Sequence, residues 1–105
     1  MKKLIFYVPV ENSEEVKNAI FDADGGVLGN YSHCSWEVDG LGQFKPLKGA
    51  NPTIGEVDKL EQVPEKRVEM LLEDKVVSKV IQVLKSSHPY EEPAFEIYDV
   101  LNDRY

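Results

Sequence analysis

Residue types that commonly build metal and redox sites are scarce in this sequence. Its 105 residues include one cysteine, Cys34, and two histidines, His33 and His88. A single cysteine excludes an internal disulfide and a thiolate framework for structural zinc. Because neighbouring residues of a strand point to opposite faces, His33 and Cys34 are not expected to share an ion. The thiol is therefore interpreted as a small buried hydrophobe.

Positive charge is also scarce. Twelve lysines and arginines against nineteen aspartates and glutamates give a net charge of −7. This balance repels the phosphates of nucleic acids and anionic membrane surfaces, so neither is an expected partner. The apolar run from Leu4 to Val10 is too short to span a membrane or to form a signal peptide. The chain is therefore expected to be a soluble cytoplasmic protein.

The motifs of several enzyme classes are missing as well. The glycines form neither G-x-x-x-x-G-K-[ST] nor G-x-G-x-x-G, so no phosphate loop is predicted. No Ser-His-Asp arrangement has supporting context. Glu91 and Glu92 are adjacent in the sequence, and their side chains are expected to diverge instead of flanking one scissile bond. The residues themselves therefore predict no catalytic site.

The apolar periodicity predicts one α+β domain over residues 1–105, the size of a single core. Strands are expected over 2–9, 31–38, 66–72 and 94–100. Helices are expected between Asn12 and Gly25 and between Asp74 and His88. A turn at Asp39-Gly40 with a short edge strand over 43–47, and a long loop over 48–64, complete the pattern. The order predicts a ferredoxin-like split βαβ sandwich (βαβ-βαβ) with an extra edge hairpin.

In this fold both helices cover the same face of the sheet. The alternation assigns the core-facing strand residues as Leu4, Phe6, Val8, Cys34, Trp36, Val38, Val68, Met70, Leu72, Phe95 and Ile97. The opposite, open face then carries Tyr7, Tyr31, His33, Ser35, Arg67, Glu69, Glu96 and Tyr98. Tyrosines in this number favour a surface covered by a partner, another copy or a ligand. An ordinary amphipathic face is the alternative.

The segment HPYEEP, over residues 88–93, is the chemically densest part of the chain. His88 follows a predicted helix, whose C-terminal dipole favours the imidazolium form. One hypothesis makes His88, Glu91 and Glu92 a site for a small ligand or divalent cation, completed by His33. The alternative makes His88 a helix cap, Tyr90 a packing residue and the carboxylates solvated. Because the two histidines are predicted near opposite sheet edges, only an oligomer is expected to bring them together.

Three ordered motifs carry a resemblance to a known family. They are GNYSHCS over 29–35, GQFKPL over 42–47 with GANP over 49–52 and IGE over 54–56, and HPYEEPA over 88–94. Together they resemble the YqfO-type insert domain of Ngg-interacting-factor-three-like proteins, a family also labelled GTP cyclohydrolase type 2 homologues. The resemblance implies a fold similar to CutA and PII-like domains, which associate into oligomers, often trimers.

The resemblance also bears on activity. In full-length members of the family, the dinuclear metal site belongs to two halves that flank this insert, and those halves are absent from this sequence. We therefore expect no enzyme activity, but a regulatory or ligand-sensing module by analogy with PII-like proteins. A divalent-metal homeostasis protein is the alternative, and a metal-dependent hydrolase ranks lowest. A divalent metal ion is the one candidate cofactor.

The predicted binding surface joins the three motifs across the subunits of a homodimer or homotrimer. His33, His88 and Glu91 are the candidate metal ligands, and Tyr31 and Tyr90 the candidate walls. The complete set of predicted ligand-binding residues is Tyr31, His33, Lys45, Asn51, His88, Tyr90, Glu91 and Glu92.

Overall fold

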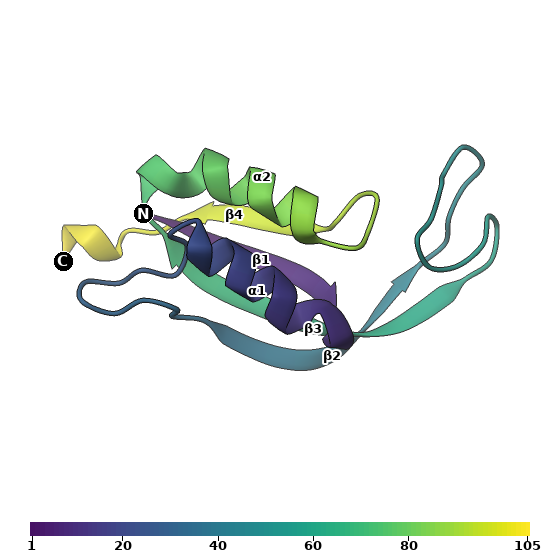
Figure 1. Cartoon of the computed structure of the whole chain (residues 1–105), viewed down its shortest axis with the longest axis horizontal. Coiled ribbons are helices and arrows are strands. Elements are labelled where there is room, and N and C mark those ends of the chain that lie inside the picture. Colours follow the sequence, from purple (N-terminus) through teal and green to yellow (C-terminus); the bar gives the residue numbers. More distant parts are fainter.

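The computed structural model describes residues 1–105 as an antiparallel four-stranded sheet with two helices on one face (Figure 1). The elements are β1 (Lys2–Pro9), α1 (Ser13–Asp22), β2 (Trp36–Phe44), β3 (Glu61–Leu72), α2 (Val77–Ser87) and β4 (Phe95–Asp99). The strands lie in the order β2-β3-β1-β4. This is the split βαβ arrangement, so the predicted α+β fold is confirmed. Neither helix has the length and apolar character to cross a membrane.

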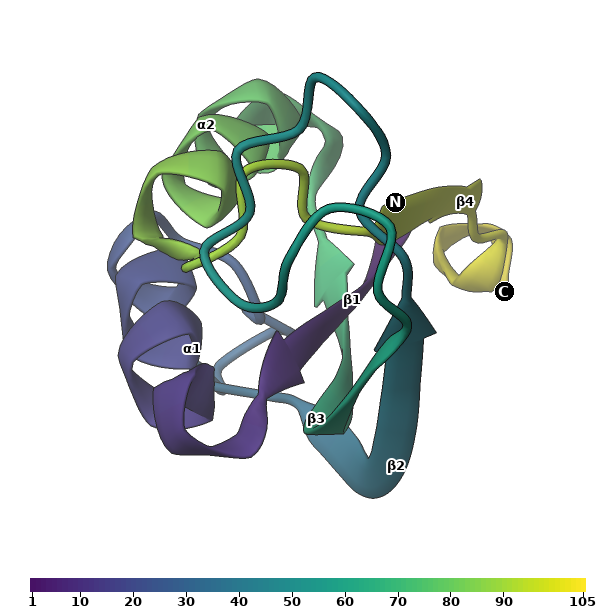
Figure 2. The same ribbon diagram turned by 90° about the vertical axis from the view of Figure 1, so that its right-hand side faces the viewer.

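The core lies between the sheet and the two helices (Figure 2). Alternate residues of β1, Leu4, Phe6 and Val8, point to the helices and have no exposed surface. The other members include Val16, Ile20, Val68, Met70, Leu72, Val80 and Leu84, with Phe95 and Ile97 packed against them. Each such side chain stabilises the fold by about 1.5–3 kcal/mol through burial. The core assigned from β1, β3 and β4 is thus confirmed.

The second strand begins later than predicted and runs further. Tyr31 forms an isolated bridge with Leu28, and His33 has a φ of 59°, so the chain turns here instead of extending. From Trp36 the strand is continuous through Asp39 and Gly40 to Phe44. The predicted turn and edge hairpin are therefore wrong. Gly40 pairs with Glu65 of β3 as an ordinary strand residue.

The two faces of β2 are the reverse of those predicted. Trp36 and Val38 lie opposite Glu69 and Arg67 on the open face, where their exposed fractions are 63% and 43%. Cys34 precedes the strand and is only partly buried. The assignment of these three residues to the core is wrong. Glu37 points to the helices instead.

Beyond the body of the sheet, β2 and β3 continue as a two-stranded arm, joined by the loop of residues 45–60 (Figure 1). The loop predicted over 48–64 is shorter because β3 starts at Glu61 and includes Pro64. β1 pairs with β3 only as far as Glu65, so the outer edge at Pro64 needs no N–H donor. The arm makes the molecule elongated, with dimensions of 48 × 24 × 23 Å.

Candidate binding site

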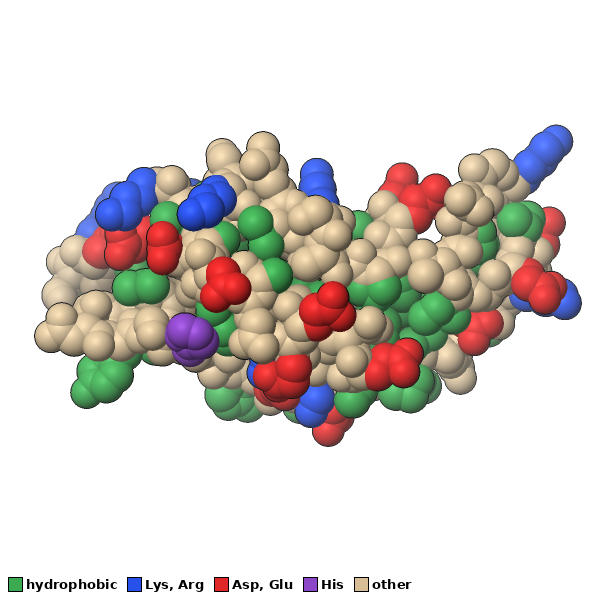
Figure 3. All heavy atoms as spheres, viewed as in Figure 1, with side chains coloured by type: hydrophobic (Ala, Val, Ile, Leu, Met, Phe, Trp, Pro, Cys, Tyr) green, Lys and Arg blue, Asp and Glu red, His purple; other side chains and the backbone are tan.

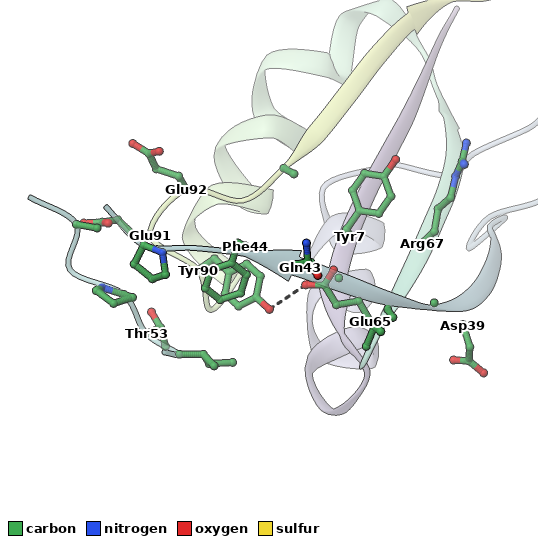
Figure 4. Close-up of a pocket in the computed structure, with 18 of the residues that line it drawn as sticks. Tyr7, Asp39, Gln43, Phe44, Thr53, Glu65, Arg67, Tyr90, Glu91 and Glu92 are labelled. Atoms are coloured by element: carbon green, nitrogen blue, oxygen red, sulfur yellow. Dashed lines mark hydrogen bonds between the residues drawn. The ribbon is translucent and has the colours of Figure 1, made fainter. Parts of the chain in front are cut away.

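A cavity of about 600 Å³ lies where the arm, its loop and the segment 90–94 meet (Figure 4). The space-filling view shows the molecule hollowed where the arm leaves the body (Figure 3). Phe44 and Glu65 come from the arm, Tyr7 from β1 and Tyr90 from the segment after α2. A cavity of this volume falls within the range of small-molecule sites.

Three hydrogen bonds hold the walls of the cavity together. The backbone N–H of Asn51 donates to the Glu91 carboxylate at 3.2 Å, and the Thr53 hydroxyl donates to the Pro89 carbonyl at 2.7 Å. The Tyr90 hydroxyl donates to Oε2 of Glu65 at 2.8 Å. The first two bonds join the loop to the HPYEEP segment, and the third joins that segment to β3.

His88 fastens the HPYEEP segment to the sheet from behind. Its imidazole is buried, with Nε2 2.6 Å from the Tyr7 carbonyl and Nδ1 3.1 Å from the Tyr90 N–H. Nδ1 accepts from the amide, so Nε2 carries the proton and donates. Burial lowers the pKa of His88, although the Tyr7 carbonyl and the Glu65 charge oppose this shift. The expectation that the helix terminus favours imidazolium is therefore wrong.

The two phenols of the cavity are held as neutral hydrogen-bond donors. Burial, followed by the hydrogen bond to Glu65, raises the pKa of Tyr90. Burial also raises the pKa of Tyr7, whose hydroxyl donates to Glu96 at 3.1 Å. The rings of Tyr90 and Phe44 meet edge to face, with centroids 5.7 Å apart. This geometry suits an aromatic wall that binds by contact.

The carboxylate of Glu65 lies directly over Gly42 of the neighbouring strand. A Cβ atom on Gly42 would collide with Oε1 of Glu65, whereas a Cβ on Gly40 of the same strand would meet nothing within 4 Å. The missing side chain at position 42 therefore makes room for the carboxylate beside Tyr90.

The structure brings together two of the three predicted segments within one chain. Asn51, Tyr90 and Glu91 meet at the cavity wall, with Glu92 at its rim and His88 behind it. Lys45 is exposed at the start of the loop. These residues come from the loop and from the HPYEEP segment.

The third segment, GNYSHCS, lies at the other end of the molecule. Tyr31 and His33 precede β2, at the end of that strand opposite to the arm and its loop (Figure 1). The cavity is lined by β2 from Val38 to Phe44, and neither Tyr31 nor His33 borders it. His33 packs on Phe21, with ring centroids 4.7 Å apart. Tyr31 and His33 are therefore not part of this cavity in a single chain.

The predicted metal ligands His33, His88 and Glu91 are likewise not brought together. The chain holds no group of three or more His, Cys, Asp or Glu side chains placed to bind a metal ion. Both ring nitrogens of His88 are already in hydrogen bonds. A metal site formed between copies of the chain stays a prediction.

Sequence reasoning missed Glu65, Phe44 and Gly42 as site residues. Glu65 fell between the loop predicted over 48–64 and the strand predicted over 66–72, although the alternation of Arg67 and Glu69 continued two residues back already places it on the same face. The Glu65 carboxylate occupies the space that a side chain at position 42 would fill, and this contact depends on the register of β2 against β3. The sequence alone does not give that register.

A sandwich of this order with a long hairpin arm is the fold of CutA and PII-like proteins. The PII-like protein CutA from Nostoc superposes with a TM-score of 0.70 at 18% identity, covering 100% of this chain and 86% of that one. The periplasmic divalent cation tolerance protein CutA from Archaeoglobus fulgidus gives 0.68 at 14% identity, with coverage of 99% and 91%. At these identities the likeness defines the fold alone.

Sequence relatives identify the chain more closely. No protein-family model matches it. The GTP cyclohydrolase 1 type 2 homologues of Bacillus subtilis and Mycobacterium tuberculosis are 49% and 48% identical over 100 and 98 residues, which are 95% and 93% of this chain. A Bacillus cereus protein related to NIF3 superposes with a TM-score of 0.82 at 40% identity, over 96% of this chain.

The chain is thus a relative of one segment of the GTP cyclohydrolase 1 type 2 homologues, the NIF3-related proteins. This confirms the resemblance found in the sequence motifs. The matches cover only 27%, 26% and 26% of those three proteins, so the chain spans about a quarter of their length.

Proposed function

We propose that the chain is a non-catalytic, homo-oligomeric module that binds a small ligand in the cavity beside the arm. The observation that carries this proposal is the convergence of three segments on one cavity. The HPYEEP segment is distant in the sequence from the arm and its loop, yet hydrogen bonds through Glu65, Glu91 and Pro89 hold all three around one space. Cavities with apolar walls and a few placed polar groups are typical binding sites.

The polar groups of the cavity support binding more than catalysis. The Tyr90 hydroxyl is used to hold Glu65, and the Glu91 carboxylate is used to hold the Asn51 amide. These contacts join separate segments of the cavity wall, so both groups have a structural role. The relatives are named after a cyclohydrolase, but this chain spans about a quarter of their length. A binding or regulatory role is therefore the part that we assign to this segment.

The open face of the sheet supports the oligomeric part of the proposal. Trp36, Val38 and Tyr98 have exposed fractions of 63%, 43% and 54%. Aromatic and large apolar side chains gathered on a sheet face are characteristic of contact surfaces. We propose that other copies of the chain cover this face.

Light scattering coupled to size exclusion tests the oligomer. For the wild type we expect a mass of at least two chains of 11.9 kDa each. Trp36→Glu and Tyr98→Glu should shift the protein toward the monomer, because each buries a charge in the contact. Val10→Glu, in the turn that leads into α1, is the control, since Val10 is exposed but lies outside the sheet face. A monomeric wild type would contradict the oligomeric part of the proposal.

A further inference from the structure

The cavity has an aromatic interior with one carboxylate at its centre. Figure 4 shows Tyr90 and Phe44 side by side, with the Tyr90 hydroxyl directed at Glu65. Pro46, Pro52 and Ile54 of the loop add apolar surface. An apolar or aromatic group is the natural occupant of such walls, because its burial removes apolar surface from water.

One oxygen of the Glu65 carboxylate remains available to a ligand. Oε2 accepts the hydrogen bond from Tyr90, whereas no group of the chain donates to Oε1. Gly42 leaves the space in which this oxygen lies. The carboxylate is therefore fixed on one side and open on the other, an arrangement suited to a charge-assisted hydrogen bond.

The charges around the cavity select a cation. The cavity is lined by the carboxylates of Glu65, Glu91 and Glu92. The guanidinium of Arg67 is the single positive charge among its lining residues. Nε of Arg67 lies 3.5 Å from Glu69, which offsets its charge. Asp39 also borders the cavity, but its carboxylate points away from Tyr7 and Arg67 (Figure 4) and pairs with Lys66 at 2.9 Å. An anionic ligand would meet repulsion here.

From this geometry we propose that the cavity binds a small molecule with a primary ammonium group on an apolar or aromatic body. The ammonium donates to Oε1 of Glu65, and the body lies against Phe44 and Tyr90. Attraction of the cation to the aromatic rings adds to the ion pair. This inference rests on the proposed function, because it names the ligand class of the same cavity.

Titration followed by NMR chemical shifts tests the ligand class. The probes are 2-phenylethylamine, 2-phenylethanol and 3-phenylpropanoate at millimolar concentration, which share the aromatic body and differ in charge. We expect the amine to bind most tightly and to shift the backbone amides of Gly42 and Tyr90. 3-Phenylpropanoate should not bind, because four carboxylates and a single guanidinium line the cavity.

Variants with matched controls test the role assigned to Glu65. Glu65→Gln keeps an acceptor for the Tyr90 hydroxyl and removes the charge, so amine affinity should fall at least about tenfold, which equals 1.4 kcal/mol. Glu11→Gln removes a charge from the exposed turn before α1, outside the cavity, and should change affinity less than about twofold. Gly42→Ala displaces the Glu65 carboxylate and should weaken amine binding, whereas Gly40→Ala should not.

The outcomes separate this inference from the proposed function. Equal binding of all three probes, or an amine affinity unchanged in Glu65→Gln, would overturn the choice of a cation and leave the cavity as a binding site. Failure of all three probes to shift the amides of Gly42 and Tyr90 would overturn the cavity as a small-ligand site as well.

Discussion

At the scale of single residues, His88 connects three parts of the molecule. It ends α2, it donates a hydrogen bond to the Tyr7 carbonyl of β1, and it accepts a hydrogen bond from the Tyr90 amide of the cavity wall. Only the neutral imidazole with its proton on Nε2 makes both bonds, because a protonated Nδ1 cannot accept. The charge state of His88 thus decides whether the hydrogen bond to the Tyr90 amide, one of the contacts that hold the HPYEEP segment, can form.

This role predicts that stability depends on pH through His88. The folded-state pKa is lowered by burial, so the unfolded state binds the proton more readily. The contribution of the neutral imidazole is fully present above the unfolded pKa of about 6.5. It is lost as the pH falls from that value through the lowered folded pKa. We expect a loss of about 1–3 kcal/mol on acidification, the cost of an unsatisfied buried amide.

Denaturant unfolding at about pH 7.5 and about pH 5 measures this loss. In His88→Gln the difference between the two conditions should be smaller than in the wild type, even though the variant is less stable at the higher pH. His33→Gln is the control, because the His33 ring is exposed and contacts Phe21 at the surface. A pH dependence that His33→Gln reduces and His88→Gln leaves intact would contradict the assignment.

The sequence places His88 correctly at the end of a helix because the residue before a proline leaves the helical region. Its protonation state was not predictable in the same way. The helix dipole acts over one turn and favours the charged form, whereas burial against Tyr7 and Tyr90 favours the neutral form. Burial depends on segments that are distant in the sequence, and here it outweighs the dipole.

At the scale of elements, the orientation of β2 places Glu37 between two lysines, Lys17 of α1 at 2.6 Å and Lys66 of β3 at 3.3 Å. Glu37 faces the helices, where Lys17 of α1 donates to it at 2.6 Å and also contacts Glu14 at 2.8 Å. The hydrogen bond from Lys17 lowers the pKa of Glu37, while its partial burial opposes the shift. The Lys17 side chain is 11% exposed, so without Glu37 its ammonium would be poorly solvated and would keep only Glu14 as a partner.

A double-mutant cycle tests this pair. Lys17→Met and Glu37→Gln should each destabilise the protein, and the coupling energy should be about 1 kcal/mol or more. The control is the exposed pair Lys59 and Glu56, whose side chains are 70% and 71% exposed. For that pair we expect a coupling of about 0–0.5 kcal/mol. Equal coupling in the two cycles would show that Glu37 does not hold β2 through Lys17.

The error in β2 has a clear physical source. Cys34, Trp36 and Val38 alternate as a half-buried strand would, and this alternation predicted that they face the core. The positive φ of His33 ends that pattern, and the partner of Glu37 lies twenty residues earlier on a helix. β1 and β3 were predicted correctly because their buried residues, such as Phe6 and Val68, repeat without a competing ion pair.

At the scale of the whole molecule, the arm and the body are separable. The body contains the core, while the loop of residues 45–60 contributes walls to the cavity and two hydrogen bonds to the HPYEEP segment. Phe44 and Glu61 are paired at the end of the arm, directly across the two strands. A two-residue turn can therefore close the strands at this position.

Replacing residues 45–60 by Asn-Gly is expected to leave a folded protein that does not bind in the cavity. Shortening a loop changes the closure entropy only slowly with length, so the melting temperature should change by a few degrees at most. Amine binding should be lost, because Pro46, Pro52 and Ile54 are removed. Thermal unfolding and the amine titration measure the two effects. A variant that fails to fold would show that the loop also supports the core.

The fold class was predictable because strand and helix periods recur in the same order in both halves. The cavity was only half predictable. The motifs around Asn51 and Tyr90 stand out in the sequence, but their meeting depends on how far β2 and β3 extend together. No local pattern determines the length of that pairing.

The dimensions of 48 × 24 × 23 Å also affect how the protein behaves in solution. A particle twice as long as it is wide experiences more friction than a sphere of equal mass. Its elution volume will therefore suggest a somewhat heavier species than the mass of one chain. Deleting the arm should reduce this apparent excess far more than the lost residues alone account for.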